Sequence, residues 1–183
     1  MVEPQWLNDD EREAWLALVA LMFKMPGTIE RQLVDDEDLS LAEYLVLAML
    51  SEAPDRSHRM SDLAAATFTG QSRLSRIVAR LERHDYVRRS ANAQDRRVVV
   101  AQLTQDGFEK VRSAAPGHVA HVREEIFDRL SAQQVEQIAR IARDLTDGVE
   151  PPRVCASWPG CSLSDDLALI RPASSGAGLA WAG

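Results

Sequence analysis

Apolar residues recur with the period of an α-helix over most of the chain. Two apolar stripes lie towards the ends of this periodic region, one formed by Trp15, Leu18, Met22 and Met25 and the other by Val135, Ile138, Ala142 and Leu145. Intervals of three and four residues place the members of each stripe on one face of a helix. We therefore expect a helix near each end, with one apolar face that is buried.

Capping signals mark where several helices begin. The residues that fit an N-cap position are Asn8 or Asp9, Ser40, Ser61, Thr104 and Ser131. Ser40 and Ser131 are each followed three residues later by Glu43 or Gln134, which completes a capping box. Pro26 and Gly27 predict a bend or break in the first helix, whereas Pro116 and Gly117 predict a kink that does not end the helix after Thr104.

The middle of the chain combines short helices with a change to the period of a β-strand. The expected elements are a turn or loop over 53–59, a short helix over 62–67, a turn at 68–70, a longer helix that ends near His84, and two strands over 86–89 and 97–103. The two strands are rich in β-branched or aromatic residues, and the polar segment between them indicates a β-hairpin with a long tip.

Composition narrows the class of protein. Hydrophobic residues make up 45% of the 183 residues and charged residues 27%, which is typical of a globular chain. No apolar run approaches the roughly 18 residues that a membrane span needs, and the acidic start lacks the features of a signal peptide, so we expect a cytoplasmic protein without a membrane partner. From 150 to 183 the chain is rich in proline and glycine and has little periodicity, which indicates a flexible tail.

Charge is strongly segregated along the chain. The formal net charge of −7 argues against a nucleic-acid partner, yet residues 56–113 hold 12 basic and 6 acidic side chains, a net charge of +6. Within this segment, residues 71–97 contain eight arginines. A local basic surface of this kind is what binding to phosphate groups requires.

The order of short helix, turn, longer helix and hairpin is that of a winged helix-turn-helix, whose second helix enters the major groove of DNA. The stretch LAAATFTGQSRLSRIVARLERHDYV at 63–87 and the stretch DRRVVVAQLTQDG at 95–107 resemble the MarR family of transcriptional regulators. The second stretch carries the more specific signature, Asp-x-Arg at the wing followed by a strand and Leu-Thr-x-x-Gly. The resemblance covers about residues 10–147.

The resemblance implies a mainly α fold with a small β-hairpin wing. It divides the chain into a winged helix-turn-helix domain over 1–149, with a DNA-binding core at about 56–104 and dimerisation helices at about 9–36 and 105–147, and a tail over 150–183. It further implies a homodimer that binds a pseudo-palindromic operator on double-stranded DNA, a repressor released by a small effector that is often an aromatic acid, and neither a cofactor nor an enzymatic activity.

Site residues follow from their positions in these motifs. The residues that the resemblance assigns to the major groove are Gln71, Ser72, Arg73, Ser75 and Arg76, and we place Arg80 on the same polar side. At the wing, Arg97 is expected in the minor groove and Arg96 on a phosphate, while Asp95 holds the wing by pairing with a nearby arginine. Two residues depart from the family pattern. Asp85 stands where glycine is usual, but Asp tolerates the left-handed turn. Gly70 replaces the usual Ser or Thr cap, which weakens the start of the helix by only a few tenths of a kcal/mol.

Alternative functions rest on weaker signals. His118 and His121, with Glu124 and Glu125 one turn further on, have the spacing of a metal site, but the interpretation we favour is a solvent-exposed polar helix face without a metal. Cys155 and Cys161 could form a redox-sensing disulfide in the tail. A winged helix can also serve as a protein–protein interaction module without DNA. No catalytic motif is found, so an enzyme is not expected.

Overall fold

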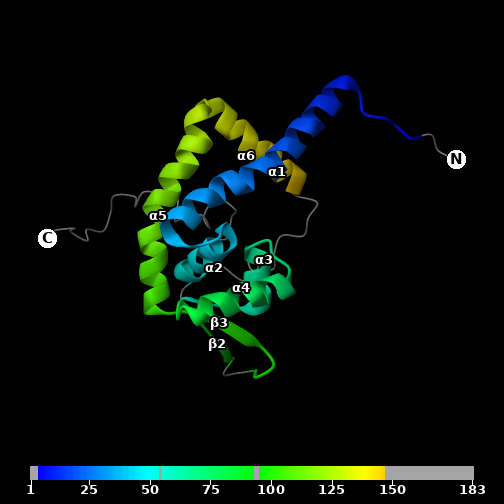
Figure 1. Ribbon diagram of the computed structural model, residues 1–183. Helices are drawn as coiled ribbons and strands as arrows, with labels where there is room; N and C mark the ends of the chain where they lie inside the picture. Colours follow the sequence, from blue (N-terminus) through cyan, green and yellow to red (C-terminus); the bar gives the residue numbers. More distant parts are fainter. Residues whose placement is uncertain (1–3, 54, 93–94, 147–183) are drawn as a thin grey trace.

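The computed structural model describes residues 4–53, 55–92 and 95–146 (Figure 1). The elements in chain order are α1 (Asp9–Glu37), α2 (Leu41–Glu52), β1 (Ser57–Arg59), α3 (Met60–Ala66), α4 (Gln71–Arg83), β2 (Val87–Ala91), β3 (Val99–Leu103), α5 (Gln105–Glu125), a 3-10 helix η1 (Phe127–Arg129) and α6 (Ala132–Thr146). The expected mainly α fold with a β-hairpin is confirmed. The tail over 150–183, with Cys155 and Cys161, lies outside the described residues.

The first helix runs without interruption through Pro26, so the predicted break is wrong. Proline removes one backbone donor, but the turns on either side keep theirs, and Thr28 Oγ1 donates to the carbonyl of Lys24 at 3.1 Å. Beyond the proline, α1 lies along α5, and Lys110 Nζ of α5 meets Glu37 Oε2 at 2.7 Å. These contacts hold the C-terminal half of α1 in place. Pro116 likewise lies inside α5 without ending it, as expected.

The sheet has three strands in the order β1-β3-β2, all antiparallel. The hairpin of β2 and β3 is confirmed, with Val87 opposite Leu103 and Ala91 opposite Val99. Strand β1 lies within the segment 53–59 that we expect to be a loop, so that expectation is wrong. Its sequence Ser-His-Arg has no apolar alternation that would indicate a strand. The strand forms because it pairs with β3, which comes from a distant part of the chain.

Most helix starts have the expected caps. Asn8 and Ser40 form capping boxes with Glu11 and Glu43, and Thr104 Oγ1 accepts from the backbone N–H of Gly107 at 3.0 Å. Ser61 is the exception: α3 begins at Met60, and the N-cap residue Arg59 makes no side-chain cap. Because β1 continues to Arg59, the chain passes directly from strand into helix and leaves no position for a capping serine.

The core lies where α2, α3, α4, β3 and the start of α5 meet. Its largest fully buried side chains are Leu33, Leu47, Leu50, Leu63, Leu74, Leu81, Val46, Val78, Val87 and Val111. Gly107 closes this core at the start of α5, where a Cβ atom would lie 2.1 Å from the carbonyl oxygen of Tyr86. That carbonyl follows Asp85, whose φ of 57° gives the left-handed turn expected after α4.

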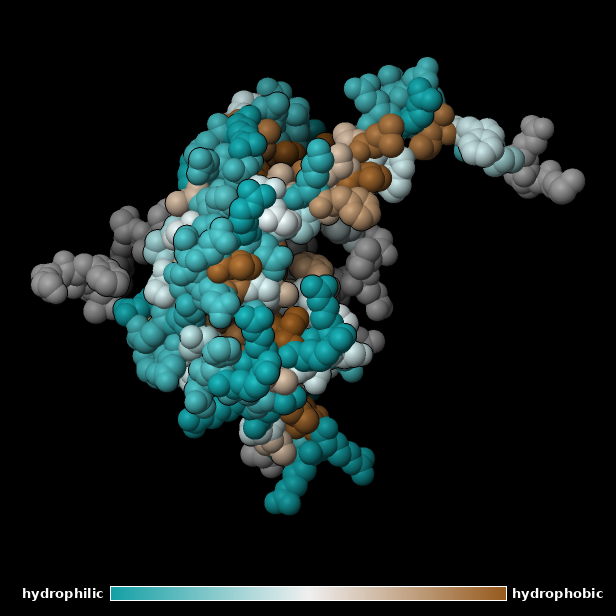
Figure 2. Space-filling view, in the orientation of Figure 1, coloured by the Kyte–Doolittle hydropathy of each residue, from teal (hydrophilic) through white to brown (hydrophobic). Residues whose placement is uncertain are grey.

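Two apolar surfaces stay uncovered in the single chain. On α1, Trp15 is 52% and Phe23 83% exposed, and on α6, Ile138 is 52% exposed. Figure 2 shows apolar side chains gathered on the part of α1 that extends away from the body. The expectation that these helices bury an apolar face is therefore not met by α6, which contributes no buried residue, and is met by α1 only at Ile29 and Leu33. Among the described helices, none is long and apolar enough to cross a membrane.

Candidate nucleic-acid interface

Helix α4 has one apolar and one polar face. Leu74, Val78 and Leu81 point into the core and anchor the helix. The five residues expected at the major groove are all exposed, namely Gln71, Ser72, Arg73, Ser75 and Arg76. Gly70 occupies the N-cap position without a side-chain cap. Because the core fixes the apolar face, the polar face is presented outward as one rigid surface.

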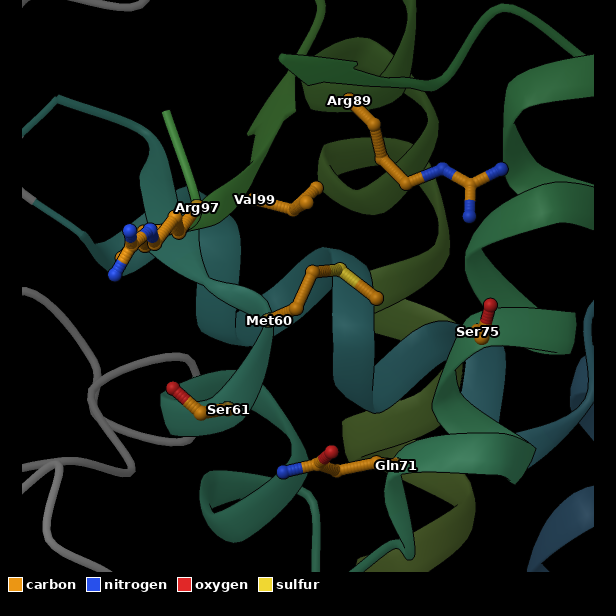
Figure 3. A pocket seen from close by; sticks show the side chains of 8 residues that line it. Met60, Ser61, Gln71, Ser75, Arg89, Arg97 and Val99 are labelled. Carbon is orange, nitrogen blue, oxygen red and sulfur yellow. The ribbon is translucent and has the colours of Figure 1, made fainter. Parts of the chain in front are cut away.

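The polar face of α4 and the wing border one hollow of about 410 Å³ (Figure 3). Gln71 and Ser75 line it from α4, and Arg97 and Val99 line it from the wing. Met60 and Ser61, at the start of α3, contribute to its floor. The structure thus brings residues from both predicted contact segments to one concave surface.

The wing tip is organised by Asp95, but in a different way from the one expected. Its Oδ1 accepts from the backbone N–H of Arg97 at 2.9 Å, and its own N–H donates to Asn92 Oδ1 at 3.2 Å. The predicted pairing with a nearby arginine is thus made to the backbone of Arg97, with no ion pair to a guanidinium among the described residues. A short carboxylate bonds the backbone two residues on more readily than a distant side chain. The turn leaves the side chains of Arg96 and Arg97 exposed.

Arg80 does not share the exposed position of Arg73 and Arg76. Its Nε lies 3.0 Å from Glu43 Oε1, and its Nη2 lies 3.5 Å from Asp38 Oδ1. The side chain is thus engaged at the corner between α1 and α2. Helical periodicity placed it on the polar side, but the residues that hold it are remote in the sequence.

An ion pair between Glu82 and Arg89 was missed by sequence reasoning. Glu82 accepts from the Arg89 backbone N–H at 2.9 Å and from its Nε at 2.8 Å, which joins α4 to β2. The hydrogen bond from the Arg89 side chain is the main reason that the pKa of Glu82 lies below its usual range. The available signal was that Glu82 is the one acidic residue of α4.

Four exposed arginines, two on the polar face of α4 and two at the wing tip, carry positive charge without an ion-pair partner among the described residues. In the segments that the structure describes, Arg73, Arg76, Arg96 and Arg97 have no carboxylate within 4.0 Å. Arginines in this state keep their donors available for phosphate oxygens and base edges. These four cations, together with Gln71, Ser72 and Ser75, are the side chains that the interface can offer to a ligand.

His118 lies in the interior and not on a solvent-exposed face, which corrects the simple interpretation of this helix. It is 7% exposed, and its ring centroid lies 4.3 Å from that of Tyr44 in α2. Burial, followed by the nearby His121, lowers the pKa of His118. His121 Nε2 lies 2.9 Å from the carbonyl oxygen of Thr28 in α1. Within the described part of the chain, no three metal-ligating side chains come together.

We expect His118 to make the stability of the fold depend on pH. Because the pKa is lower in the folded chain than the ordinary value of about 6.5, the unfolded chain binds more protons between the two values. The contribution of His118 is therefore fully present above pH 6.5 and is lost as the pH falls towards the lowered value. Thermal melts between pH 7.5 and 5.5 should show this loss in the wild type and less of it in His118→Phe. A substitution at the exposed His84, His84→Gln, should leave the pH dependence intact; an unchanged dependence in His118→Phe would contradict the assignment.

Comparison with known proteins agrees with this geometry. Residues 37–98 match the model of the MarR family. The chain is 36% identical to Sco3205 of Streptomyces coelicolor, a MarR family transcriptional regulator solved in complex with DNA. The structural match covers 86% of this chain and 99% of that one, with a TM-score of 0.78. AbsC of the same organism is 34% identical with a TM-score of 0.75, covering 80% and 98%. The transcriptional regulator HosA of Escherichia coli is 32% identical over 59% of this chain and 78% of its own length.

Proposed function

Because this chain belongs to the MarR family of transcriptional regulators, we propose that it represses transcription by binding a specific DNA site with α4 and the wing. The observation that carries the proposal is the hollow between these two elements. It is lined by Gln71 and Ser75 of the exposed polar face of α4 and by Arg97 of the wing.

The proposed contacts divide into two kinds. Gln71, Ser72, Arg73, Ser75 and Arg76 lie on the face that would enter a major groove, where Gln and Arg side chains can make two hydrogen bonds to one base. Arg97 at the wing would reach the adjacent minor groove, and Arg96 a phosphate. Base contacts then supply the sequence preference and phosphate contacts the register.

We also propose that the protein acts as a homodimer. The support is the uncovered apolar surface of α1 and α6, which a second copy would bury. In this arrangement α1, α5 and α6 form the dimer region around a DNA-binding core at about 56–104. Two-fold symmetry then places two copies of α4 in successive major grooves, so the half-sites would lie about 10 base pairs apart.

An effector would end repression by changing the distance or angle between the two copies of α4. The suggestion that the effector is a small aromatic acid comes from the family resemblance alone. A ligand shifts such an equilibrium only by its difference in affinity between the two arrangements.

DNA binding should weaken steeply with salt, because each phosphate contact releases bound counterions. We expect Arg97→Ala to lower the affinity about tenfold, and Arg96→Ala to reduce the slope of log K against log salt by about 0.9. Fluorescence anisotropy with duplexes from the region upstream of its own gene would measure both quantities. Arg112→Ala is the control, since Arg112 lies on α5 and pairs with Glu109. Absent or salt-insensitive binding would refute the proposal and favour a protein–protein interaction module.

A further inference from the structure

Arg80 links α4 to the corner between α1 and α2. The guanidinium bridges two elements: its Nε pairs with Glu43 at 3.0 Å, and its Nη2 lies 3.4 Å from the Asp38 carbonyl oxygen and 3.5 Å from its carboxylate. Asp38 ends α1 in a left-handed conformation with φ of 51°, and Glu43 belongs to the first turn of α2. One side chain of α4 thus touches both helices at their junction.

Glu43 is the central residue of this junction. It is 2% exposed, and its Oε2 accepts from the backbone N–H of Ser40 at 2.9 Å and from the Ser40 hydroxyl at 2.8 Å. Its Oε1 is the atom that pairs with Arg80. A buried carboxylate needs a compensating positive charge, and Arg80 supplies it.

The junction itself is tied to α1 by a second acidic residue. Glu30 Oε1 of α1 accepts from the backbone N–H of Leu41 at 3.0 Å, at the first residue of α2. The carboxylates of Glu30 and Glu43 therefore hold α1, α2 and α4 in one arrangement. On the wing side, Glu82 fixes α4 to β2. The orientation of α4 is set from both sides by ion pairs that leave its N-terminal half exposed.

From this geometry we propose that Arg80 and Glu43 are positioning residues for DNA recognition. The pair sets the direction in which α4 presents Gln71, Arg73 and Arg76, and Arg80 makes no phosphate contact of its own. The inference rests on the proposed DNA-binding function, and it replaces the sequence-based assignment of Arg80 as a DNA contact.

A positioning residue and a phosphate contact differ in two measurable ways. Loss of a phosphate contact weakens binding to every sequence and lowers the salt slope by about one. Loss of correct orientation weakens binding to the specific site, where base edges must be met, and leaves non-specific binding and the salt slope unchanged. Mere destabilisation of the fold changes neither quantity once the folded, active fraction has been determined by titration.

The experiment compares five variants of the full chain on two duplexes. One duplex is the sequence that the wild-type protein enriches from a randomised pool, and the other is a scrambled sequence of the same composition. The variants are Arg80→Gln, Arg80→Lys, Glu43→Gln, the double variant of Arg80→Gln with Glu43→Gln, and Arg96→Gln as the control for a phosphate contact. Glutamine at position 43 keeps the capping box, because Gln also serves at the third position of a helix.

We expect Arg80→Gln and Glu43→Gln each to lower specific affinity about tenfold, the double variant to lose no more than either single one, and the salt slope to stay at the wild-type value. Arg96→Gln, at the expected phosphate contact, should lower the slope by about 0.9. Arg80→Lys, which retains a charge for Glu43, should recover part of the specific affinity.

Two results would overturn the inference. If Arg80→Gln lowers the slope as Arg96→Gln does, Arg80 is a phosphate contact. If Glu43→Gln leaves specific affinity unchanged or raises it, the pair does not orient α4. A wild-type chain that enriches no sequence would instead refute the proposed function, so the two failures are distinct.

Discussion

Gly107→Ala is expected to lower the free energy of unfolding by about 3 kcal/mol, at the upper end of what overpacking usually costs. The added Cβ would lie 2.1 Å from the carbonyl oxygen of Tyr86 and 2.8 Å from a methyl group of Leu103. The first contact is with backbone, which cannot rotate away as a side chain does. That carbonyl also accepts from the N–H of Thr104 at 3.0 Å, so moving it would disturb the start of α5.

Chemical denaturation followed by circular dichroism would measure this loss. Gly27→Ala is the matched control, since Gly27 also lies inside a helix and a Cβ there meets nothing within 4 Å. In that open position alanine should stabilise the helix by up to about 1 kcal/mol. Equal stability of Gly107→Ala and the wild type would mean that α5 can move away from the turn after α4 at little cost.

Ile138→Glu is expected to separate the proposed dimer and to lower operator affinity by about a hundredfold or more. Ile138 lies on the apolar stripe of α6 and is half exposed in the single chain. A carboxylate placed there would be buried without a partner in the dimer. A monomer has one copy of α4 and loses the gain in affinity that comes from binding two half-sites at once.

Light scattering after gel filtration gives the mass, and anisotropy with a two-half-site duplex gives the affinity. Gln137→Glu adds the same charge at the neighbouring exposed position, off the stripe, and should keep both the mass and the affinity. A wild type with the mass of one chain, or an Ile138→Glu variant with the mass of two, would exclude the proposed interface.

Local signals were sufficient for most of the fold. Ser40 and Thr104 define helix starts because a cap depends on residues within one turn, and Asp85 takes the left-handed turn that its short polar side chain tolerates. Strand β1 was missed because nothing in Ser-His-Arg indicates a strand; its pairing partner β3 is far along the chain. Continuity of α1 through Pro26 depends in the same way on α5, which packs beside it.

In the candidate site, too, local features could be predicted from the sequence, whereas contacts between distant residues could not. The exposed face of α4 follows from helical period alone, so Gln71, Arg73 and Arg76 were placed correctly on the surface. Arg80 also lies on the polar side, but its ion pair with Glu43 could not be predicted, since Glu43 belongs to another helix. His118 was expected on an exposed face, and only the packing of Tyr44 against it shows that it is buried.

Strand β1 has a mechanical consequence for the whole DNA-binding unit. It pairs with β3 of the wing and passes directly into α3, and the N–H of Leu103 donates to the carbonyl of Arg56 at 2.8 Å just before it. The wing and the helix-turn-helix therefore form one rigid unit and not two parts joined by a hinge. A rigid unit of this kind can rotate as a whole, but its two parts cannot separate. In the proposed dimer, a signal received elsewhere would therefore change the spacing between the two DNA-binding units, while each unit keeps its shape.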